Sequence, residues 1–185
     1  MWCFSYLPVY VVAAMWFSGS VTDAFGKSGP YELKFRRIEH CQDEGTQEFK
    51  YHEKLNKVSK YEYSYNGEIV IPDNSKLGLV ALFYKKRDNG WGTPIYRINS
   101  EHACSDLKKS IPDTFDRFTK EYMGVENTCP VKSGKYNAEN WIMKIDRLPM
   151  ETMEYGEYKV AADLVRDGEK VGCMNLYLDV EKKRD

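Results

Sequence analysis

Of the five cysteines in this sequence, Cys3 lies in an N-terminal segment that we expect to be cleaved off, and the other four, Cys41, Cys104, Cys129 and Cys173, could support covalent or metal chemistry. They could oxidise in pairs to disulfides, or their thiolates could bind zinc. Structural zinc sites usually place two ligands within about four residues of each other, and no two of these cysteines are that close. We therefore expect two disulfides, and four cysteines allow three pairings.

Catalytic side chains show no recognisable arrangement. The sequence has no Gly-x-Ser-x-Gly elbow, no His-Glu-x-x-His motif and no glycine loop of the kind that cradles phosphate. Its histidines, His40, His52 and His102, are isolated from one another, and we predict that each is a polar surface residue. The sequence therefore predicts a protein that is not an enzyme, with no catalytic residue, cofactor or metal site.

Three runs near the end of the chain alternate apolar and polar residues with a period of two, the pattern of half-buried strands. They are Trp141 to Ile145, Tyr158 to Leu164 and Met174 to Val180. Asp167-Gly168 lies between the second and third runs, where a tight reversal needs residues that tolerate positive φ. We therefore predict an antiparallel pair that ends the domain.

Further strands are predicted upstream. Tyr31, Leu33 and Phe35 alternate with charged residues, and extended regions follow at Phe49 to Tyr51 and at Tyr61 to Tyr65. Asn66-Gly67 predicts a hairpin turn, after which Ile69 to Ile71 forms the returning strand. Residues 50–60 have no clear period, so the pattern leaves their structure open.

The run Leu77 to Tyr84 is apolar on both parities. Such a strand is buried on both faces, or one face meets the core and the other meets a ligand or a helix. Asn89-Gly90 predicts a turn, and Trp91 to Ile98 is expected to return. No repeat or low-complexity linker divides the chain, so we expect one domain.

Residues 100–123 interrupt the strand pattern and predict one or two short helices. Ser100 could cap a helix that carries Ala103 and Leu107 and stops at Pro112. Asp113 could cap a second helix, on which apolar residues recur at helical spacing and which ends at Gly124. Those apolar residues are Phe115, Phe118 and Tyr122.

The first 24 residues predict a secretory signal. Leu7 to Phe17 is an apolar run of eleven residues, and the first Lys is residue 27. Spanning a bilayer needs about 20 apolar residues, so we expect cleavage near Ala24, or near Ser20, with a membrane anchor as the alternative. Residues 25–185 then form one domain that is secreted, extracellular or in the lysosomal lumen.

Charge gives no indication of a nucleic-acid partner. The chain has 27 Lys and Arg and 28 Asp and Glu, and Asp23 is the only charged residue before Phe25. The mature chain is therefore close to neutral, and its basic residues are scattered rather than clustered.

Several short motifs follow one another in a characteristic order along the second half of the chain. They are the run of residues 76–83, Asn89-Gly-Trp91, residues 104–112, Cys129-Pro-Val-Lys, Gly134-Lys-Tyr136, Leu148-Pro149, Gly156-Glu-Tyr158 and Gly172-Cys173. In these motifs the sequence resembles the ganglioside-activator proteins of the ML lipid-recognition superfamily, and within it the divergent secreted insect branch that includes the CheB-like proteins. The resemblance covers residues 75–180 well and 30–75 weakly.

This resemblance implies an all-β fold, an immunoglobulin-like antiparallel β-sandwich that forms a cup around an apolar cavity. It also implies the pairing of Cys41 with Cys173 and of Cys104 with Cys129. Two mature disulfides are fewer than we expect of the ganglioside activators, which favours the insect branch.

A cup of this kind needs apolar residues at its rim and adaptable residues along its wall. For Trp141 and Met143 the alternative is plain sandwich core, and we expect Met150 and Met153 on an exposed loop. The rim candidates are Ile111, Phe115, Phe118, Tyr122 and Met123, and the wall or mouth candidates are Trp91, Trp141, Met143, Met150 and Met153.

Three functions are compatible with such a cup. The first is a secreted lipid-binding or lipid-transfer protein that holds an acyl chain and presents lipid to a hydrolase. The second is chemosensory binding of hydrocarbon pheromones or tastants. The third is innate-immune recognition of microbial lipid, with a receptor as partner. Transient contact with a membrane surface is expected in the first case.

Overall fold

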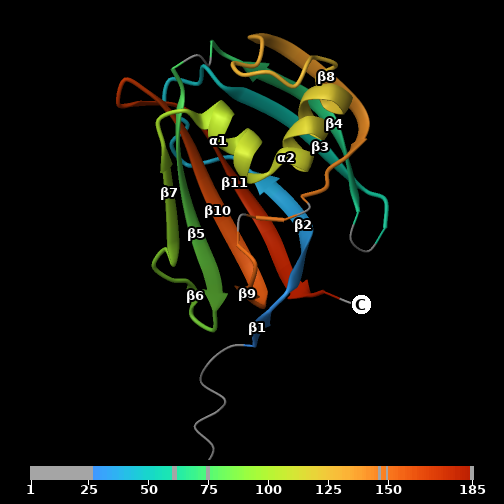
Figure 1. Ribbon diagram of the computed structural model, residues 1–185, viewed down its shortest axis with the longest axis vertical. Helices are drawn as coiled ribbons and strands as arrows, with labels where there is room; N and C mark the ends of the chain where they lie inside the picture. Colours follow the sequence, from blue (N-terminus) through green and yellow to red (C-terminus); the bar gives the residue numbers. More distant parts are fainter. Residues whose placement is uncertain (1–26, 60–61, 74–75, 146, 149, 184–185) are drawn as a thin grey trace, which may run out of the picture.

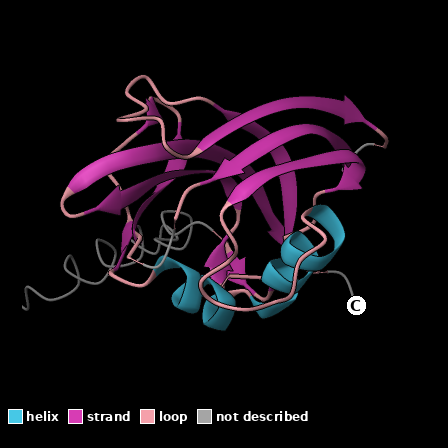
Figure 2. Cartoon of the chain, turned by 90° about the horizontal axis from the view of Figure 1, so that it is seen from above, coloured by secondary structure: helices cyan, strands magenta, loops and turns pink. Residues whose placement is uncertain are grey.

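The computed structural model describes residues 27–59, 62–73, 76–145, 147–148 and 150–183, which form an antiparallel β-sandwich with two short α-helices (Figures 1 and 2). The larger sheet has the order β2-β11-β10-β5, with β6 and β7 both paired to β5. Its strands are β2 (Tyr31–Glu39), β5 (Gly78–Arg87), β6 (Gly90–Trp91), β7 (Tyr96–Ser100), β10 (Gly156–Arg166) and β11 (Glu169–Lys182).

The smaller sheet has the order β3-β4-β8 and packs against one face of the larger one. Its strands are β3 (Lys50–Lys57), β4 (Tyr63–Ile71) and β8 (Gly134–Ile142). A two-residue ladder joins β1 (Ser28–Gly29) to β9 (Met153–Glu154). The all-β sandwich predicted from the sequence is therefore confirmed.

The β10–β11 hairpin agrees with the sequence pattern. Arg166 pairs with Glu169, and the two residues between them have φ angles of 51° at Asp167 and 84° at Gly168. Both angles lie in the left-handed region that a two-residue turn requires, and Asp and Gly are among the residues that favour it.

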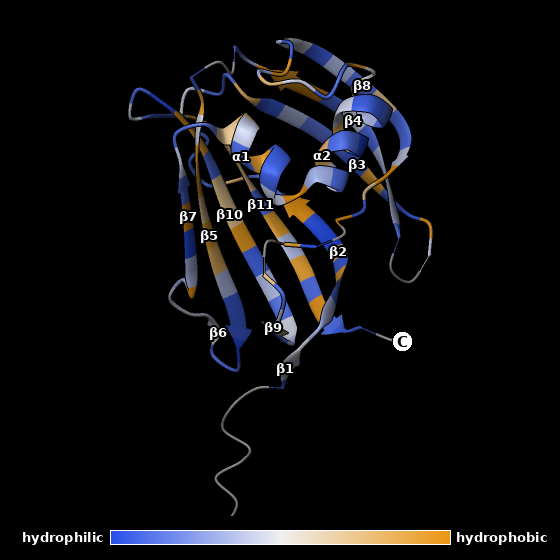
Figure 3. Ribbon diagram, viewed as in Figure 1, coloured by the Kyte–Doolittle hydropathy of each residue, from blue (hydrophilic) through white to orange (hydrophobic). Residues whose placement is uncertain are grey.

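Apolar side chains of one parity form the inner face of the larger sheet. Leu79, Ala81 and Phe83 on β5 pair with Leu164, Ala162 and Val160 on β10, so their side chains share one face. Figure 3 shows the resulting bands of apolar and polar residues along β10 and β11. The run from Leu77 to Tyr84 is therefore a strand with one face toward the interior of the sandwich.

The hairpin predicted at Asn66-Gly67 is wrong. β4 continues through both residues, and Gly67 pairs with Glu53 on one side and with Ala138 on the other. A Cβ at Gly67 would lie 2.0 Å from the carbonyl oxygen of His52. Glycine is therefore required here by close approach of a neighbouring strand and not by a turn.

Other strand boundaries also differ from the pattern. β8 ends at Ile142, so Met143 and Ile145 follow the strand instead of continuing it. Residues 50–57, which had no clear period, form β3. The turn predicted at Asn89-Gly90 lies one residue earlier, at Asp88-Asn89, because Gly90 pairs with Arg87, and the return is split into β6 and β7.

The helical segment consists of α1 (Ala103–Ser110), α2 (Pro112–Arg117) and a π-helical turn, η2 (Phe118–Tyr122). The predicted caps are wrong. Ser100 ends β7, where its hydroxyl donates a hydrogen bond to Asp106 Oδ2 at 2.6 Å. The capping positions are His102 for α1 and Ile111 for α2, so Asp113 lies inside the first turn.

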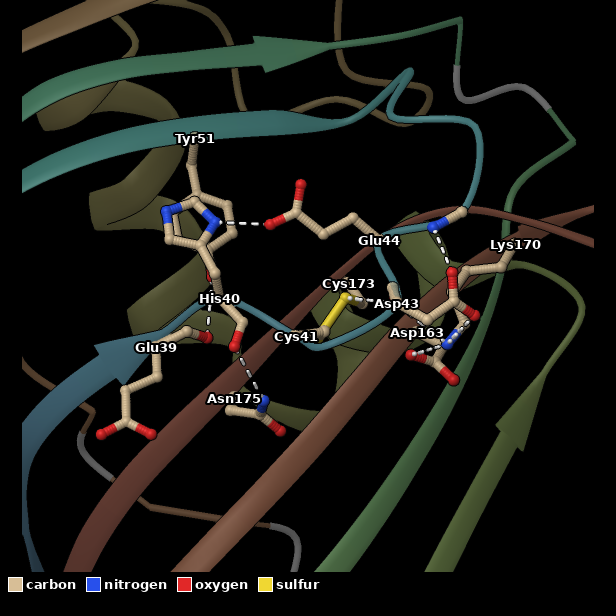
Figure 4. The surroundings of a disulfide bond; sticks show 11 residues. Glu39, His40, Cys41, Asp43, Glu44, Tyr51, Asp163, Lys170, Cys173 and Asn175 are labelled. Atoms are coloured by element: carbon tan, nitrogen blue, oxygen red, sulfur yellow. Dashed lines mark hydrogen bonds and ion pairs between the residues drawn. A yellow bond between two sulfur atoms is a disulfide. The ribbon is translucent and has the colours of Figure 1, made fainter.

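Both implied disulfides are confirmed. Cys41–Cys173 joins the segment after β2 to β11, with Cα atoms 6.2 Å apart (Figure 4). Cys104–Cys129 joins α1 to the segment before β8, with Cα atoms 5.8 Å apart. The sulfurs of these four cysteines are therefore bonded in pairs and are not thiolates.

Several predictions fall outside the described residues. They concern the signal at residues 1–24 with Cys3, the strand residue Tyr61, and Pro149 of the Leu148-Pro149 motif. In the part of the chain that the structure describes, no helix is long and apolar enough to cross a membrane.

Candidate ligand cavity

An apolar cavity of about 370 Å³ lies between the two sheets. Its walls come from the inner face of the larger sheet, the inner face of the smaller sheet and the helical segment, which lies along one side of the sandwich in Figures 1 and 2. Its polar lining residues include Ser100 and Asp106, which are hydrogen-bonded to each other. The volume lies within the usual range of small-molecule sites, about 300–1,000 Å³.

Small and flexible side chains make room for this cavity. Ala81 and Ala162 are paired neighbours on β5 and β10, and both line it. Ala162 is only partly buried although its strand lies in the middle of the sheet. The interior surface of the sheet is therefore not fully covered by other side chains.

Six of the ten predicted ligand-binding residues line the cavity. Phe115 and Tyr122 are buried and the other four are partly buried, so none stands out from the surface as a rim. For Trp141 and Met143 the cavity-wall position is found, and both also pack against core residues. The six are Ile111, Phe115, Phe118, Tyr122, Trp141 and Met143.

Trp91 does not line the cavity. It pairs with Lys86, whose parity is opposite to that of the inward-facing Phe83 and Lys85. Its ring packs against Tyr177 with centroids 5.6 Å apart, and Lys159 Nζ lies 5.9 Å from its centroid. Trp91 therefore belongs to the outer face of the larger sheet, and the expectation for it is corrected.

Met150 and Met153 do not line the cavity either, contrary to the prediction. Met153 is buried, and both pack in a cluster with Tyr158 and Val180 away from the cavity lining. The segment is held down by Tyr31, whose hydroxyl donates to the Met150 carbonyl at 2.8 Å. These methionines therefore pack over the start of β10 and the end of β11 rather than occupying an exposed loop.

Met123 is the fourth prediction that fails. It is buried beside Tyr122 but does not line the cavity. Sequence reasoning also missed many lining residues that lie at inward positions of strands or on α1. Strand parity would have identified Ile38, Tyr51, Tyr65, Ile69, Ile98, Leu164, Met174 and Leu176, and the helical spacing on α1 would have added Leu107.

Four aromatic rings form the wall between the helical segment and the smaller sheet. Trp141 meets Tyr122 at 79° and Tyr65 at 82°, with ring centroids 5.3 and 6.4 Å apart. Phe118 stacks on Tyr122 with centroids 5.3 Å apart. Burial raises the pKa of Tyr122 to about 12 and that of Tyr65 further, so both hydroxyls are neutral at physiological pH.

Hydrogen-bonding groups in this aromatic wall are few. The Tyr122 hydroxyl donates to the Gly67 carbonyl at 3.3 Å. The Trp141 Nε1 group is buried and donates to no described residue. The wall is therefore largely apolar and suited to hydrocarbon, and Trp141 Nε1 could donate to a polar atom of a ligand.

The three histidines are exposed, as predicted. His40 nevertheless has defined partners near the Cys41–Cys173 disulfide (Figure 4). Its ring stacks on Tyr51 with centroids 4.5 Å apart, and Nδ1 lies 2.8 Å from Glu44 Oε1. Its Nε2 lies 3.9 Å from Glu53 Oε2, a carboxylate oxygen that is buried between β3 and the end of β2.

A protein-family model matches part of the chain. No curated protein matches the chain. The matched family is described as a protein of unknown function (DUF1091), and the matched residues begin in β5, include the helical segment and β8, and end in β10. Over residues 79–160, which contribute Ala81, the helical wall and Trp141 to the cavity, this chain is similar to that uncharacterised family.

Proposed function

We propose that the protein binds one hydrocarbon chain, as part of a lipid or a similar apolar molecule, in the cavity between its sheets. The observation that carries this proposal is the cavity itself, whose walls are almost wholly apolar. Each buried CH₂ group contributes about 0.8 kcal/mol relative to water, so a chain of roughly ten carbons gains about 8 kcal/mol without any polar contact.

The proposal also states where the protein acts and to which proteins it is related. Two disulfides stabilise proteins in oxidising compartments, which supports a secreted protein. The disulfide pairing and the sandwich agree with what the resemblance to the ML lipid-recognition superfamily implies. The protein then carries or presents its ligand instead of transforming it.

The test is to fill the cavity without changing the rest of the sheet. In Ala162→Leu the added carbons occupy cavity volume, whereas in Ala161→Leu they lie on the opposite face of the same strand. Binding is measured by displacement of the uncharged fluorescent dye N-phenylnaphthylamine with dodecanol. We expect Ala162→Leu to weaken dodecanol binding roughly tenfold, because the leucine side chain occupies space that the ligand chain needs, and a loss of about 1.4 kcal/mol in binding free energy is tenfold.

Ala161→Leu is the matched control and should bind dodecanol like the wild type. Circular dichroism and thermal unfolding establish that both variants fold. Equal affinities in the two folded variants and the wild type would show that the ligand does not occupy this cavity.

A further inference from the structure

A second pocket adjoins the apolar cavity and shares two of its walls. It has a volume of about 620 Å³, opens to solvent and lies between the helical segment and β8. Tyr122 and Trp141 line both spaces. A molecule that rests against these two rings in the cavity therefore lies one aromatic side chain away from the second pocket.

An irregularity in β8 contributes to this pocket. Tyr65 pairs with Trp141 but Gly67 pairs with Ala138, so two residues of β8 lie opposite Asn66 alone. One of them, Asn140, has a φ of 54°, and its N–H donates to Asn66 Oδ1 at 2.9 Å. A bulge of this kind changes the direction of side chains along a strand, and residues 137–142 all line the pocket.

The charges in the pocket are unevenly compensated. Lys144 lies 3.7 Å from Glu62, and Arg117 donates a hydrogen bond to the Lys144 carbonyl at 2.8 Å. Glu121 and Glu139 also line the pocket, and neither forms an ion pair with a residue that the structure describes. The pocket therefore combines two uncompensated carboxylates with the Trp141 and Tyr122 rings.

We propose that this pocket receives the ammonium group of an amphiphile whose hydrocarbon chain occupies the apolar cavity. The inference rests on the proposed function and specifies its ligand class. An ammonium ion is attracted both by carboxylates and by aromatic ring faces. Arg117 and Lys144 line the same pocket, so a phosphate next to the ammonium is also accommodated. A head group that carries only negative charge meets Glu121 and Glu139 as well as the two cations, and Lys144 is already paired with Glu62, so it gains less than an ammonium does.

The experiment compares amphiphiles that share a dodecyl chain and differ in head group, each below its critical micelle concentration. Dodecylphosphocholine and dodecyltrimethylammonium carry the ammonium, dodecanol is neutral and dodecanoate is anionic. Affinities are measured by dye displacement for the wild type, for the Glu121→Gln and Glu139→Gln double variant, and for a control with Glu126→Gln and Glu169→Gln. The control glutamates are exposed and line neither space.

We expect both ammonium ligands to bind the wild type more tightly than dodecanol, and dodecanoate to bind more weakly. The double variant should lose about fivefold in affinity for the ammonium ligands, the scale of two partly exposed charge interactions, with dodecanol unchanged. If only dodecyltrimethylammonium shows the preference, the natural source is a long-chain amine; if dodecylphosphocholine shows it too, the source is a choline-type phospholipid.

Two results separate failure of this inference from failure of the proposed function. In the first, dodecanol binds, but the ammonium ligands bind the wild type no more tightly than dodecanol does, or bind the double variant as tightly as the wild type. The head-group assignment is then overturned and the cavity assignment stands. If no dodecyl compound displaces the dye, the cavity assignment itself fails, and the inference with it.

Discussion

Among single residues, Glu53 combines burial with an incomplete set of partners. Its side chain is 10% exposed, and its Oε2 atom accepts no hydrogen bond from a described residue. Burial raises the pKa of this carboxyl group, and the nearby His40 opposes the shift in part. The ionised form is therefore less favourable in the folded protein than in the unfolded chain.

The sign of the resulting pH dependence follows from linkage. Because the folded-state pKa of Glu53 is the higher one, protonation favours folding, and stability is lost as pH rises through the raised pKa. Glu53→Gln removes the charge, so its free energy of unfolding should exceed that of the wild type at pH 8. The difference should disappear below a pH of about 4, where the carboxyl group is protonated in both states.

Urea unfolding at a series of pH values measures this effect. Glu126→Gln, at an exposed position, is the control and should follow the wild-type profile. A Glu53→Gln variant that is less stable than the wild type at pH 8 would show that ionised Glu53 stabilises the fold through His40, contrary to our account.

At the level of elements, β4 depends on the absence of a side chain at Gly67. A Cβ there would lie 2.0 Å from the His52 carbonyl oxygen and 2.9 Å from Glu53 Cα. Gly67→Ala must therefore push β3 away from β4 or distort the bulge beside it. We expect a loss of about 2 kcal/mol or more in the free energy of unfolding.

Gly92→Ala provides the comparison, because no heavy atom lies within 4 Å of the added Cβ. It should leave the urea midpoint close to that of the wild type. Equal midpoints for Gly67→Ala and the wild type would mean that β3 and β4 are not packed as closely as described.

The elements also show which sequence signals are reliable. Alternation along Tyr158–Leu164 and Met174–Val180 predicted β10 and β11 correctly, because each strand has one face on the interior. Asn66-Gly67 gave a wrong prediction, since a turn and a central strand that a neighbouring strand approaches closely can both require glycine. The difference depends on β8, about seventy residues away, which local sequence does not reveal.

A residue of the site could be predicted where the helix or strand that carries it was predicted. The helical stripe Phe115, Phe118 and Tyr122 was found from its spacing, and all three residues line the cavity. Trp91 was not placed correctly. Its pairing with Lys86 across the turn decides which face of the sheet it occupies, and the sequence does not show that pairing. The polar pocket was missed because it depends on the β8 bulge.

For the whole molecule, two disulfides brace the sandwich at different places. Cys41–Cys173 closes a loop with a sequence separation of 132, and Cys104–Cys129 closes one of 25. Each stabilises by about 3–5 kcal/mol in the chain-entropy model. In that model the cross-linking offsets part of the packing energy that an unfilled cavity forgoes.

The central claim is that the space between the sheets holds a hydrocarbon chain. Native mass spectrometry of the protein purified from cells tests it most directly, because the complex and the free chain differ by the mass of the ligand. We predict one bound amphiphile per chain. One added dodecylphosphocholine molecule should replace each bound ligand, and Ala162→Leu should retain the ligand poorly. Protein that carries only water-soluble polar compounds, and takes up no dodecyl amphiphile when one is added, would contradict the account.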